Sequence, residues 1–465
     1  MKQPTRVLLV VSAAVFMASL DLFIVNIAFP DIQKDFGDAS DAALSWVLNA
    51  YAIVLAALLI PAGRLADLIG RKRVFIGGLA LFCLGSALCA AAPSVGLLVA
   101  ARVVQAAGAA AIMPTSLALL LPELAPEKRA IGVAAWAATG AVAGAAAPPV
   151  GGLLVQASWH WIFLVNIPVG LIAGFYGLRI LREGRDPAGG RMPDLVGAGA
   201  LVAGVAALTA GIVQGTDWGW GSARVVGLFA ASVVLLAWFV ARCARHHTPI
   251  VEIDLLRERS FAAANVAAFV FFAGFAAMLL GNVLFLTRVW GEDVLTAGLM
   301  LAPGPLTAAI FSVPSGRLAQ KVGQRALAVP GALVFGAGSL FGLLTITETH
   351  AYASTFLPAM LIGGAGVGMT IPTLSSAAAS SLPPARFATG VGVFGMARQL
   401  GSAVGVAVLV AIIGTPAPGQ TLDAIQRGWT FIVGTAVVAC LLAITMGRIH
   451  APAAAPAAAS PVAAG

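Results

Sequence analysis

Two ionisable side chains lie in stretches of sequence that offer them no water. Asp21 is surrounded by Leu20, Leu22 and further apolar residues, and Arg102 lies in a second apolar run. Gln105 follows Arg102 by one helical turn, so the two side chains project from the same helix face. If these runs cross a bilayer, each ionised group costs roughly 2.5–3.5 kcal/mol on insertion scales. Asp21 and Arg102 are therefore the first candidates for chemistry.

A carboxyl group in such surroundings can take up and release protons. Burial disfavours the charged form of an acid, whereas a nearby cation favours it. Asp21 is therefore predicted to bind a proton or a cation, with a static ion pair to Arg102 or a plain polar contact as the alternatives. Arg102 cannot lose its charge, so we expect it to face a cavity or a partner, or else to serve helix packing.

Further polar and aromatic residues within apolar runs are candidates for lining a pathway. Amide side chains inside membrane helices can equally form hydrogen bonds between helices. Phenylalanines that face a cavity suit a lipophilic ligand, although packing against the core explains them as well. The candidates for a substrate pathway are Asn26, Asn49, Gln105, Phe272, Phe275, Asn282, Arg398 and Gln399.

The elements that carry these residues are membrane-spanning helices. Of 465 residues, 60% are hydrophobic and 10% charged, whereas a soluble domain averages roughly 25% charged residues. A helix needs about 20 apolar residues to cross the hydrocarbon core. The sequence predicts fourteen such helices, over residues 7–29, 44–63, 74–92, 95–121, 130–156, 161–181, 195–213, 225–241, 261–286, 294–316, 326–346, 352–380, 388–414 and 428–446. The fold class is therefore an all-α polytopic membrane protein.

The positive charges predict the orientation. Most of the 27 Lys and Arg residues fall in loops on the side that both termini share, and only Lys34, Arg224, Arg288 and Arg427 fall in loops on the other side. The positive-inside rule then places both termini in the cytoplasm. The net charge of +8 forms no separate basic domain, which argues against nucleic acid as a partner. The four cysteines form no C-x-x-C pair, so no metal site and no cofactor is expected.

An internal repeat predicts how the helices are grouped. Gly63, Arg64 and Gly70 follow the second predicted helix, and Gly316, Arg317 and Gly323 recur in register after the tenth. A weaker echo relates residues 108–115 to residues 366–373. Both echoes shift the helix number by eight, so we expect two six-helix bundles, over 1–182 and 260–450, with two helices inserted over 183–259 and a disordered tail over 451–465. Two such bundles can rock around a site near the membrane midplane, and a duplicated scaffold without transport is the alternative.

Two short segments suggest moving parts. The loop after the second helix is a charged turn bounded by glycines, and it forms a candidate gate that comprises Gly63, Arg64, Asp67, Gly70, Arg71 and Lys72. The fifth predicted helix contains a candidate hinge that comprises Gly144, Pro148, Gly151 and Gly152. Small residues let helices approach closely and proline kinks a helix, which suits a hinge or seal and also tight static packing.

These segments resemble those of a known family. Residues 63–73 resemble motif A of the major facilitator superfamily, and residues 20–30 resemble the first-helix signature of its fourteen-spanner branch, drug:proton antiporter family 2. The stretch from Arg102 to Gln105 resembles motif B, and residues 144–152 resemble motif C, which is linked to antiporters. Phe23, Ala106 and Ala147 stand where these motifs usually have Thr, Gly and Gly.

The resemblance implies a multi-pass exporter in the cell (inner) membrane, expected to be a monomer. It would exchange protons for small lipophilic or cationic organic molecules, such as drugs or antibiotics, by alternating access. Asp21 would bind the proton or a cationic substrate, Arg102 would assist coupling, and the motif A loop would latch one conformation. A proton-coupled importer of a small metabolite is the alternative. An enzyme is not favoured because the five histidines lie in loops or at helix ends, and no lysine follows a glycine as an ATP-binding P-loop requires.

Overall fold

The computed structural model describes residues 3–37, 39–125, 129–185, 192, 194–382, 387–417 and 419–447. Over these ranges the chain forms helices and no strands, and fourteen spans are long and apolar enough to cross a membrane. The predicted fold class and number of spans are confirmed. Helices satisfy their own backbone hydrogen bonds, which is what a segment surrounded by lipid requires. The predicted tail over 451–465 lies outside the described residues.

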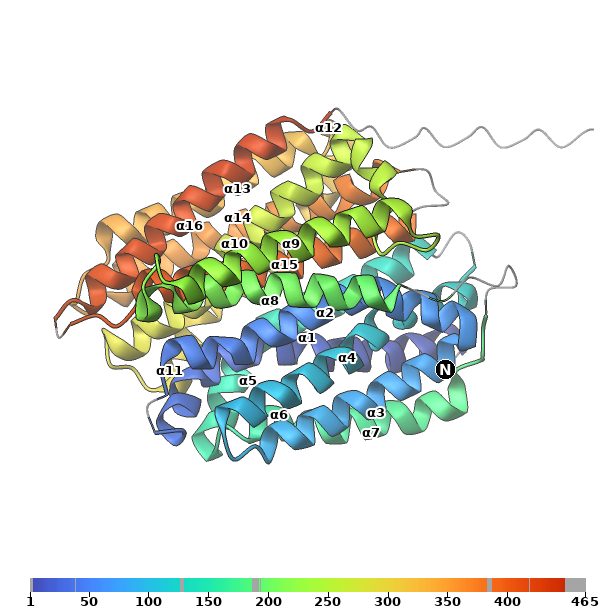
Figure 1. Cartoon of the computed structure of the whole chain (residues 1–465), viewed down its shortest axis with the longest axis horizontal. Helices are drawn as coiled ribbons and strands as arrows, with labels where there is room; N and C mark the ends of the chain where they lie inside the picture. Colours follow the sequence, from blue (N-terminus) through green and yellow to red (C-terminus); the bar gives the residue numbers. More distant parts are fainter. Residues whose placement is uncertain are drawn as a thin grey trace, which may run out of the picture.

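The first six spans form one set of packed helices, drawn in blue to cyan in the lower part of Figure 1. We call α1–α7 the first set. Serine side chains accept hydrogen bonds from backbone N–H groups at the start of two of its helices, Ser40 before α2 and Ser94 before α4. Its helices are α1 (Gln3–Asp35), α2 (Asp41–Ile69), α3 (Arg71–Ala90), α4 (Val95–Leu120), α5 (Arg129–Ala157), α6 (Trp161–Leu164) and α7 (Asn166–Ile180).

The last six spans form a second set in the upper part of Figure 1, and we call α10–α16 the last set. Two of its spans are interrupted, one at Ala302 and one by a π-helical turn. Its helices are α10 (Arg259–Arg288), α11 (Val294–Leu301), α12 (Pro303–Val322), α13 (Arg325–Thr345), η4 (Tyr352–Phe356), α14 (Leu357–Ser380), α15 (Phe387–Ile413) and α16 (Thr421–Ile444).

The two remaining spans lie in front of both sets in Figure 1. α8 (Leu195–Trp218) packs on α2 and α15, whereas α9 (Ala223–Arg245) packs chiefly on α8. At the start of α8, the carboxylate of Asp194 accepts hydrogen bonds from the N–H of Gly197 and from Arg242 of α9. The ion pair between Asp194 and Arg242 therefore joins α8 to α9. The domain boundaries predicted around it remain a prediction.

The internal repeat is visible in how two helix pairs pack. A Cβ on Gly108 of α4 would meet the backbone nitrogen of Phe82 at 2.5 Å, and a Cβ on Gly366 of α14 would meet the same atom of Phe335. Both pairs, α3 with α4 and α13 with α14, thus approach until their backbones nearly touch. In this register Arg102 and Gln105 correspond to Met360 and Gly363.

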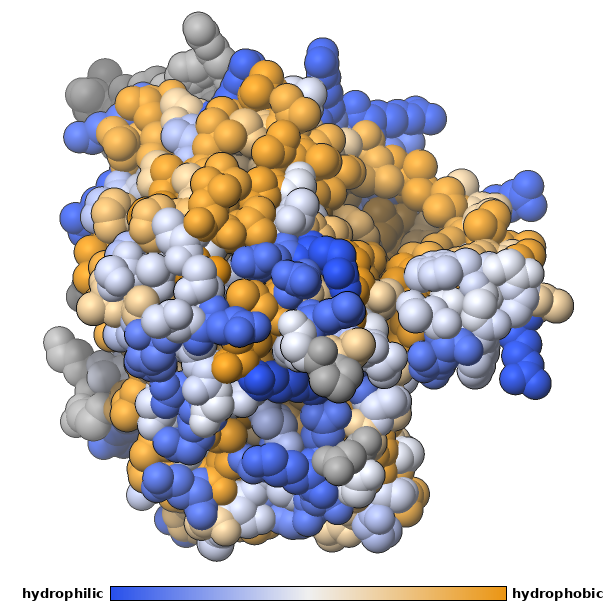
Figure 2. All heavy atoms as spheres, turned by 90° about the vertical axis from the view of Figure 1, so that its left-hand side faces the viewer, coloured by the Kyte–Doolittle hydropathy of each residue, from blue (hydrophilic) through white to orange (hydrophobic). Residues whose placement is uncertain are grey.

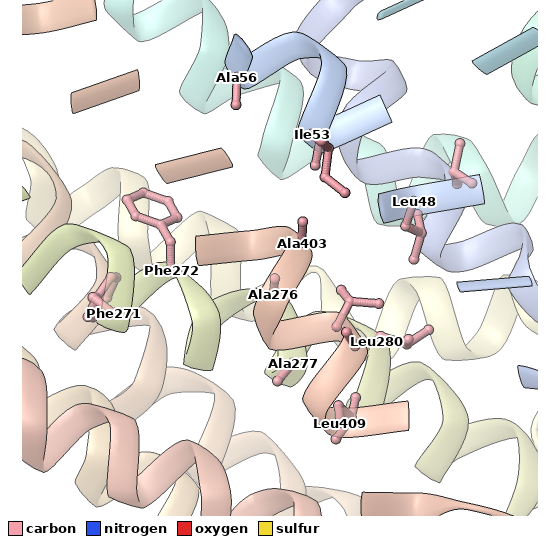
Figure 3. Packing of buried hydrophobic residues seen from close by; sticks show 14 of the residues in the cluster. Leu48, Ile53, Ala56, Phe271, Phe272, Ala276, Ala277, Leu280, Ala403 and Leu409 are labelled. Atoms are coloured by element: carbon pink, nitrogen blue, oxygen red, sulfur yellow. The ribbon is translucent and has the colours of Figure 1, made fainter. Parts of the chain in front are cut away.

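The two sets meet along α2 and α15 and along α5 and α11. Figure 3 shows Ile53 and Ala56 of α2 facing the last set, with Ala403 of α15 opposite Ile53 and with Ala276 and Leu280 of α10 behind it. All five side chains are buried. Apolar packing therefore joins the sets over the middle of the molecule.

One end of the molecule carries both the start of α1 and the end of α16, and we call the opposite end the far end (Figure 1). At the far end Arg288 of α10 donates to both carboxylate oxygens of Asp41 of α2, at 2.7 and 2.6 Å. A cavity of about 880 Å³ beside this pair is lined by charged residues that include Asp31, Lys34 and Glu292. Figure 2 views the far end and shows hydrophilic residues gathered across its middle.

Candidate functional site

Asp21 and Arg102 form a buried ion pair inside the first set. Nη1 of Arg102 lies 2.5 Å from Oδ2 of Asp21, and neither residue exposes any surface. Nε of Arg102 also donates to the carbonyl of Val47 on α2, at 3.0 Å. The structure therefore brings together α1, α2 and α4 around one pair of opposite charges, which was one of the alternatives for Asp21.

Three neutral side chains complete the cluster. Gln105 donates from Nε2 to Oδ1 of Asp21 at 2.8 Å and to Oγ of Ser86 at 2.8 Å. Its Oε1 accepts from Arg102 at 2.6 Å. Asn166 donates from Nδ2 to Oδ1 of Asp21 at 3.0 Å. All five residues are buried, and we call them the buried polar cluster: Asp21, Ser86, Arg102, Gln105 and Asn166.

Local backbone features position these side chains. A Cβ on Gly85 of α3 would lie 2.6 Å from the backbone of Gln105, so only glycine lets α3 and α4 approach this closely. The approach brings Ser86, the next residue, into reach of the Gln105 amide. Asn166 is the first residue of α7, directly after the interruption at Val165. The break in the sixth span therefore places an amide beside Asp21.

The surroundings of Asp21 suit a carboxylate. Arg102, Gln105 and Asn166 all donate to it, and a carboxylate only accepts. A proton on Asp21 would remove the negative charge that Arg102 faces and would add a donor that needs an acceptor of its own. Breaking a buried ion pair costs about 3–5 kcal/mol because it leaves an uncompensated charge. A change of protonation at Asp21 is therefore tied to a rearrangement of the cluster.

Two aromatic rings flank the Arg102 guanidinium. Its carbon lies 4.1 Å from the centre of the Tyr51 ring and 5.8 Å from that of Phe163. A cation over an aromatic face is stabilised by the ring quadrupole. The Tyr51 hydroxyl is buried and has no hydrogen-bond partner among the described residues.

The pathway candidates of the last set do not join the buried polar cluster. Arg398 is partly exposed, and its nearest aromatic contact is the ring of Phe272, 5.8 Å from the guanidinium carbon. Gln399 is buried, and its Nε2 lacks a partner among the described residues. Asn282 accepts from the indole N–H of Trp429 at 3.2 Å. Asn282 therefore serves contacts within the last set.

The remaining pathway candidates lie on α1, α2 and α10. Asn26 donates to the carbonyl of Phe23 within α1, at 3.3 Å. Both polar atoms of the Asn49 side chain are buried without a partner among the described residues. Phe275 meets Phe23 edge-on at a centroid distance of 6.5 Å and Phe272 edge-on at 5.8 Å. The two phenylalanine candidates thus belong to one aromatic contact that joins α1 with α10.

The motif A residues lie at the end of α2 and the start of α3, so that helix occupies most of the predicted loop and only Gly70 lies between the two helices. They contact mostly the first set. Arg71 donates from Nε to Asp67 at 2.8 Å. Gly70 has φ of +122°, and a Cβ there would lie 2.6 Å from the Glu183 carboxylate. That carboxylate accepts from the N–H of Lys72, at 3.0 Å. The turn is thus shaped by a glycine that no other residue replaces without strain.

Three further members of the predicted gate have separate contacts. Arg64 lies 3.9 Å from the carboxylate of Glu252, which follows the inserted helices. Nζ of Lys72 donates to the carbonyl of Leu178 at 2.7 Å. Gly63 faces Pro114 of α4, where an added Cβ would find contact at 3.4 Å. The role of this loop as a latch remains a prediction.

The motif C residues of α5 form close contacts with both sets. A Cβ on Gly144 would meet Phe23 at 3.3 Å, and one on Gly151 would meet Ile24 at 2.9 Å. A Cβ on Gly152 would lie 2.7 Å from Cα of Leu295 in α11. The carbonyl oxygen of Pro148 lies against Gly298 of the same helix. Small residues therefore let α5 approach α1 and the last set at the far end.

Several residues in and around the cluster escaped prediction from sequence. Ser86, Asn166, Tyr51 and Phe163 occur in apolar runs where a small polar or aromatic residue gives little signal. The one available signal was the Gly85-Ser86 pair, because a glycine beside a polar residue in a membrane helix favours close helix contact. No group of three or more His, Cys, Asp or Glu that could hold a metal ion occurs among the described residues.

Comparison with known families gives a match along most of the chain. The family model described as the Major Facilitator Superfamily matches residues 11–406, and a second match covers residues 264–464. Multidrug resistance protein Stp of Mycobacterium tuberculosis is 33% identical over 410 residues, which are 87% of this chain and 75% of that protein. The methylenomycin A resistance protein of Streptomyces coelicolor is 32% identical over 431 residues, covering 90% of this chain and 88% of the relative. The tetracenomycin C resistance and export protein of Streptomyces glaucescens is 32% identical over 408 residues, with 88% and 75% covered.

Solved structures show the same fold. A bacterial homologue of the human lysosomal transporter Spinster, in an inward-facing and unoccupied conformation, superposes with a TM-score of 0.66 at 18% identity. The match covers 96% of this chain and 98% of that one. A bacterial homologue of the human drug peptide transporters PepT1 and PepT2 gives a TM-score of 0.67 at 17% identity, with 95% and 97% covered. At these identities the likeness establishes the fold.

Proposed function

The chain belongs to the major facilitator superfamily, and we propose that it exports small organic molecules from the cell in exchange for protons. Three curated relatives at 32–33% identity are named for multidrug resistance, for antibiotic resistance or for export. Their names support an efflux role for a multi-pass membrane protein with small-molecule substrates. We place it in the cytoplasmic membrane as a monomer, with both termini in the cytoplasm as the positive charges predict.

The observation that carries proton coupling is the buried carboxylate of Asp21. Three groups donate to this carboxylate, so a proton on Asp21 removes the partner charge of Arg102 and loosens the cluster. The last set has Met360 and Gly363 at the positions that correspond to Arg102 and Gln105. Protons are therefore handled by the first set alone, and the energy of a gradient, about 2.3 kcal/mol per charge per 100 mV, enters there.

The contacts between the sets suggest how the cycle proceeds. The far end is closed by Arg288 with Asp41 and by the glycine contacts of α5 with α11. Opening that end requires these contacts to separate while the two sets rock around the site. Both kinds of contact can separate and reform. The ion pair lies at the far end of the molecule, and the glycines have no side chains that interlock. Asp21 can then exchange its proton in one conformation and hold it in the other.

Inside-out membrane vesicles provide the test of this function. Respiration acidifies their lumen, and the vesicles are offered methylenomycin A or tetracenomycin C, the compounds named for two relatives. We expect at least one of these compounds to accumulate in the lumen, and nigericin, which dissipates the pH gradient, to abolish that accumulation. Accumulation that needs ATP and survives nigericin would contradict proton coupling. Loss of the compound from preloaded vesicles would favour the importer.

A further inference from the structure

The positive charge of Arg398 on α15 has no counterion among the described residues. Arg102 has Asp21, Gln105 and a backbone carbonyl as partners, whereas Arg398 forms no ion pair with a described residue. Its Nε is buried and has no acceptor there. Its only aromatic neighbour at cation–π range is Phe272. An unpaired cation in a membrane protein is costly, which points to a function.

A second unpartnered polar group lies beside this charge on α15. Gln399 follows Arg398 in the chain and is at least nine-tenths buried, with a side-chain nitrogen that donates to nothing described. Ile53 and Ala56 of α2, which Figure 3 shows facing the last set, lie on the helix that packs against α15. Buried polar groups are almost always hydrogen-bonded, so the polar groups of Arg398 and Gln399 are incomplete without another molecule.

The missing molecule has to supply acceptors and negative charge. The unpartnered atoms at Arg398 and Gln399 are both donors. A carboxylate accepts several such bonds at once, and a guanidinium binds it through parallel bonds. A positively charged molecule would instead meet an uncompensated like charge. Repulsion of this kind is how a site rejects the wrong ligand.

Aromatic rings beside the charge suit an apolar body. Phe272 contacts Phe394 of α15 edge-on at 6.3 Å and Phe275 edge-on at 5.8 Å, and Phe275 reaches Phe23 of α1. Phe23 and Phe275 are both partly exposed. These rings come from both sets, so a ligand held among them would contact both parts that move. Pockets for organic ligands combine such apolar walls with a few placed polar groups.

We propose that Arg398, with Gln399, recognises the acidic group of the transported molecule, so that the substrates are lipophilic organic acids. The proposal rests on the export function and narrows its substrate class, and it differs from the lipophilic or cationic molecules that the family resemblance implies. Arg398 then sets specificity, while Asp21 and Arg102 handle the proton.

Binding of three matched ligands tests the proposal without any gradient. The purified protein in nanodiscs is titrated with 1-naphthoate, 1-naphthylmethylammonium and 1-naphthalenemethanol, which share one ring system and differ in charge. We expect the carboxylate to bind at least tenfold more tightly than the other two. Arg398→Gln should remove this preference, and Arg398→Lys, which keeps the charge but not the planar fork, should retain part of it.

The exposed Arg427 of α16 provides the control, because Arg427→Gln removes an equal charge away from the site. Equal or tighter binding of the ammonium or the alcohol, no saturable binding of the carboxylate, or a preference that survives in Arg398→Gln would overturn the proposal. Because binding needs no proton gradient, these results are separate from the vesicle test. Export that is proton-driven with cations as substrates would leave the function standing and remove the substrate class.

Discussion

Removing one partner of the Asp21–Arg102 pair should lower the free energy of unfolding far more than removing both partners. Arg102→Met leaves a carboxylate with no water and no cation, and Asp21→Asn leaves a guanidinium in the same position. Each single change is expected to cost about 3–5 kcal/mol of unfolding free energy. In the double variant, which combines Asp21→Asn with Arg102→Met, neither charge remains. The last set has Met360 at the position that corresponds to Arg102. We therefore expect a coupling energy of about 3 kcal/mol or more between the two sites.

Unfolding of the purified variants by SDS in mixed micelles, followed by tryptophan fluorescence, measures these free energies. The matched control is the pair of Asp67 and Arg71 at the end of α2, whose side chains are 39% and 26% exposed. Partly exposed pairs four residues apart contribute only about 0.3–0.5 kcal/mol. A coupling energy between Asp21 and Arg102 that is no larger than the control value would refute the buried pair as the main electrostatic contact of the cluster.

Three other perturbations test separate parts of the structure. Gly70→Ala puts a Cβ 2.6 Å from the Glu183 carboxylate at φ of +122° and should cost about 1–3 kcal/mol in thermal unfolding, whereas Gly174→Ala, which meets open space, should cost nothing. Burial acts to raise the pKa of Asp194, but hydrogen bonds from Arg242 and the N–H of Gly197 outweigh it and hold that pKa below its ordinary value. This stabilisation is present above the ordinary pKa and is lost as the pH falls through the lowered one. Asp194→Asn should therefore destabilise the protein at pH 7, and a difference from wild type that persists unchanged well below pH ~4 contradicts this. Reversing the charge of either Asp41 or Arg288 should slow vesicle transport several-fold, and exchanging the two charges should restore it; no recovery in the exchange variant excludes the pair as a far-end latch.

The number and place of the spans follow from the sequence because each must supply about 20 apolar residues. Interruptions within spans do not follow in the same way. The sixth span breaks at Val165 and the tenth at Ala302, and each break lies within a predominantly apolar run. A hydropathy pattern carries no signal at such a point. The break at Val165 matters for the site because it begins α7 at Asn166.

Asp21 and Arg102 were identifiable because a charge in an apolar run is costly wherever it lies. Their donors and acceptors were not, because Ser86 and Asn166 become partners only through the packing of α3 and α7 on α1 and α4. The same limit applies to Arg398. Its sequence position shows a charge in an apolar run, but only the structure shows that no described carboxylate reaches it.

Transport by Asp21→Asn in reconstituted liposomes tests the central claim most directly. Asparagine keeps the shape of the side chain but cannot carry the proton. The account predicts that the variant still exchanges labelled for unlabelled substrate across the membrane, yet no longer accumulates substrate when a pH gradient is imposed. Asp423 is an exposed residue of α16 and provides the control. The Asp423→Asn variant should both exchange substrate and accumulate it when a pH gradient is imposed. Accumulation against a gradient that is as strong in Asp21→Asn as in wild type would contradict the account.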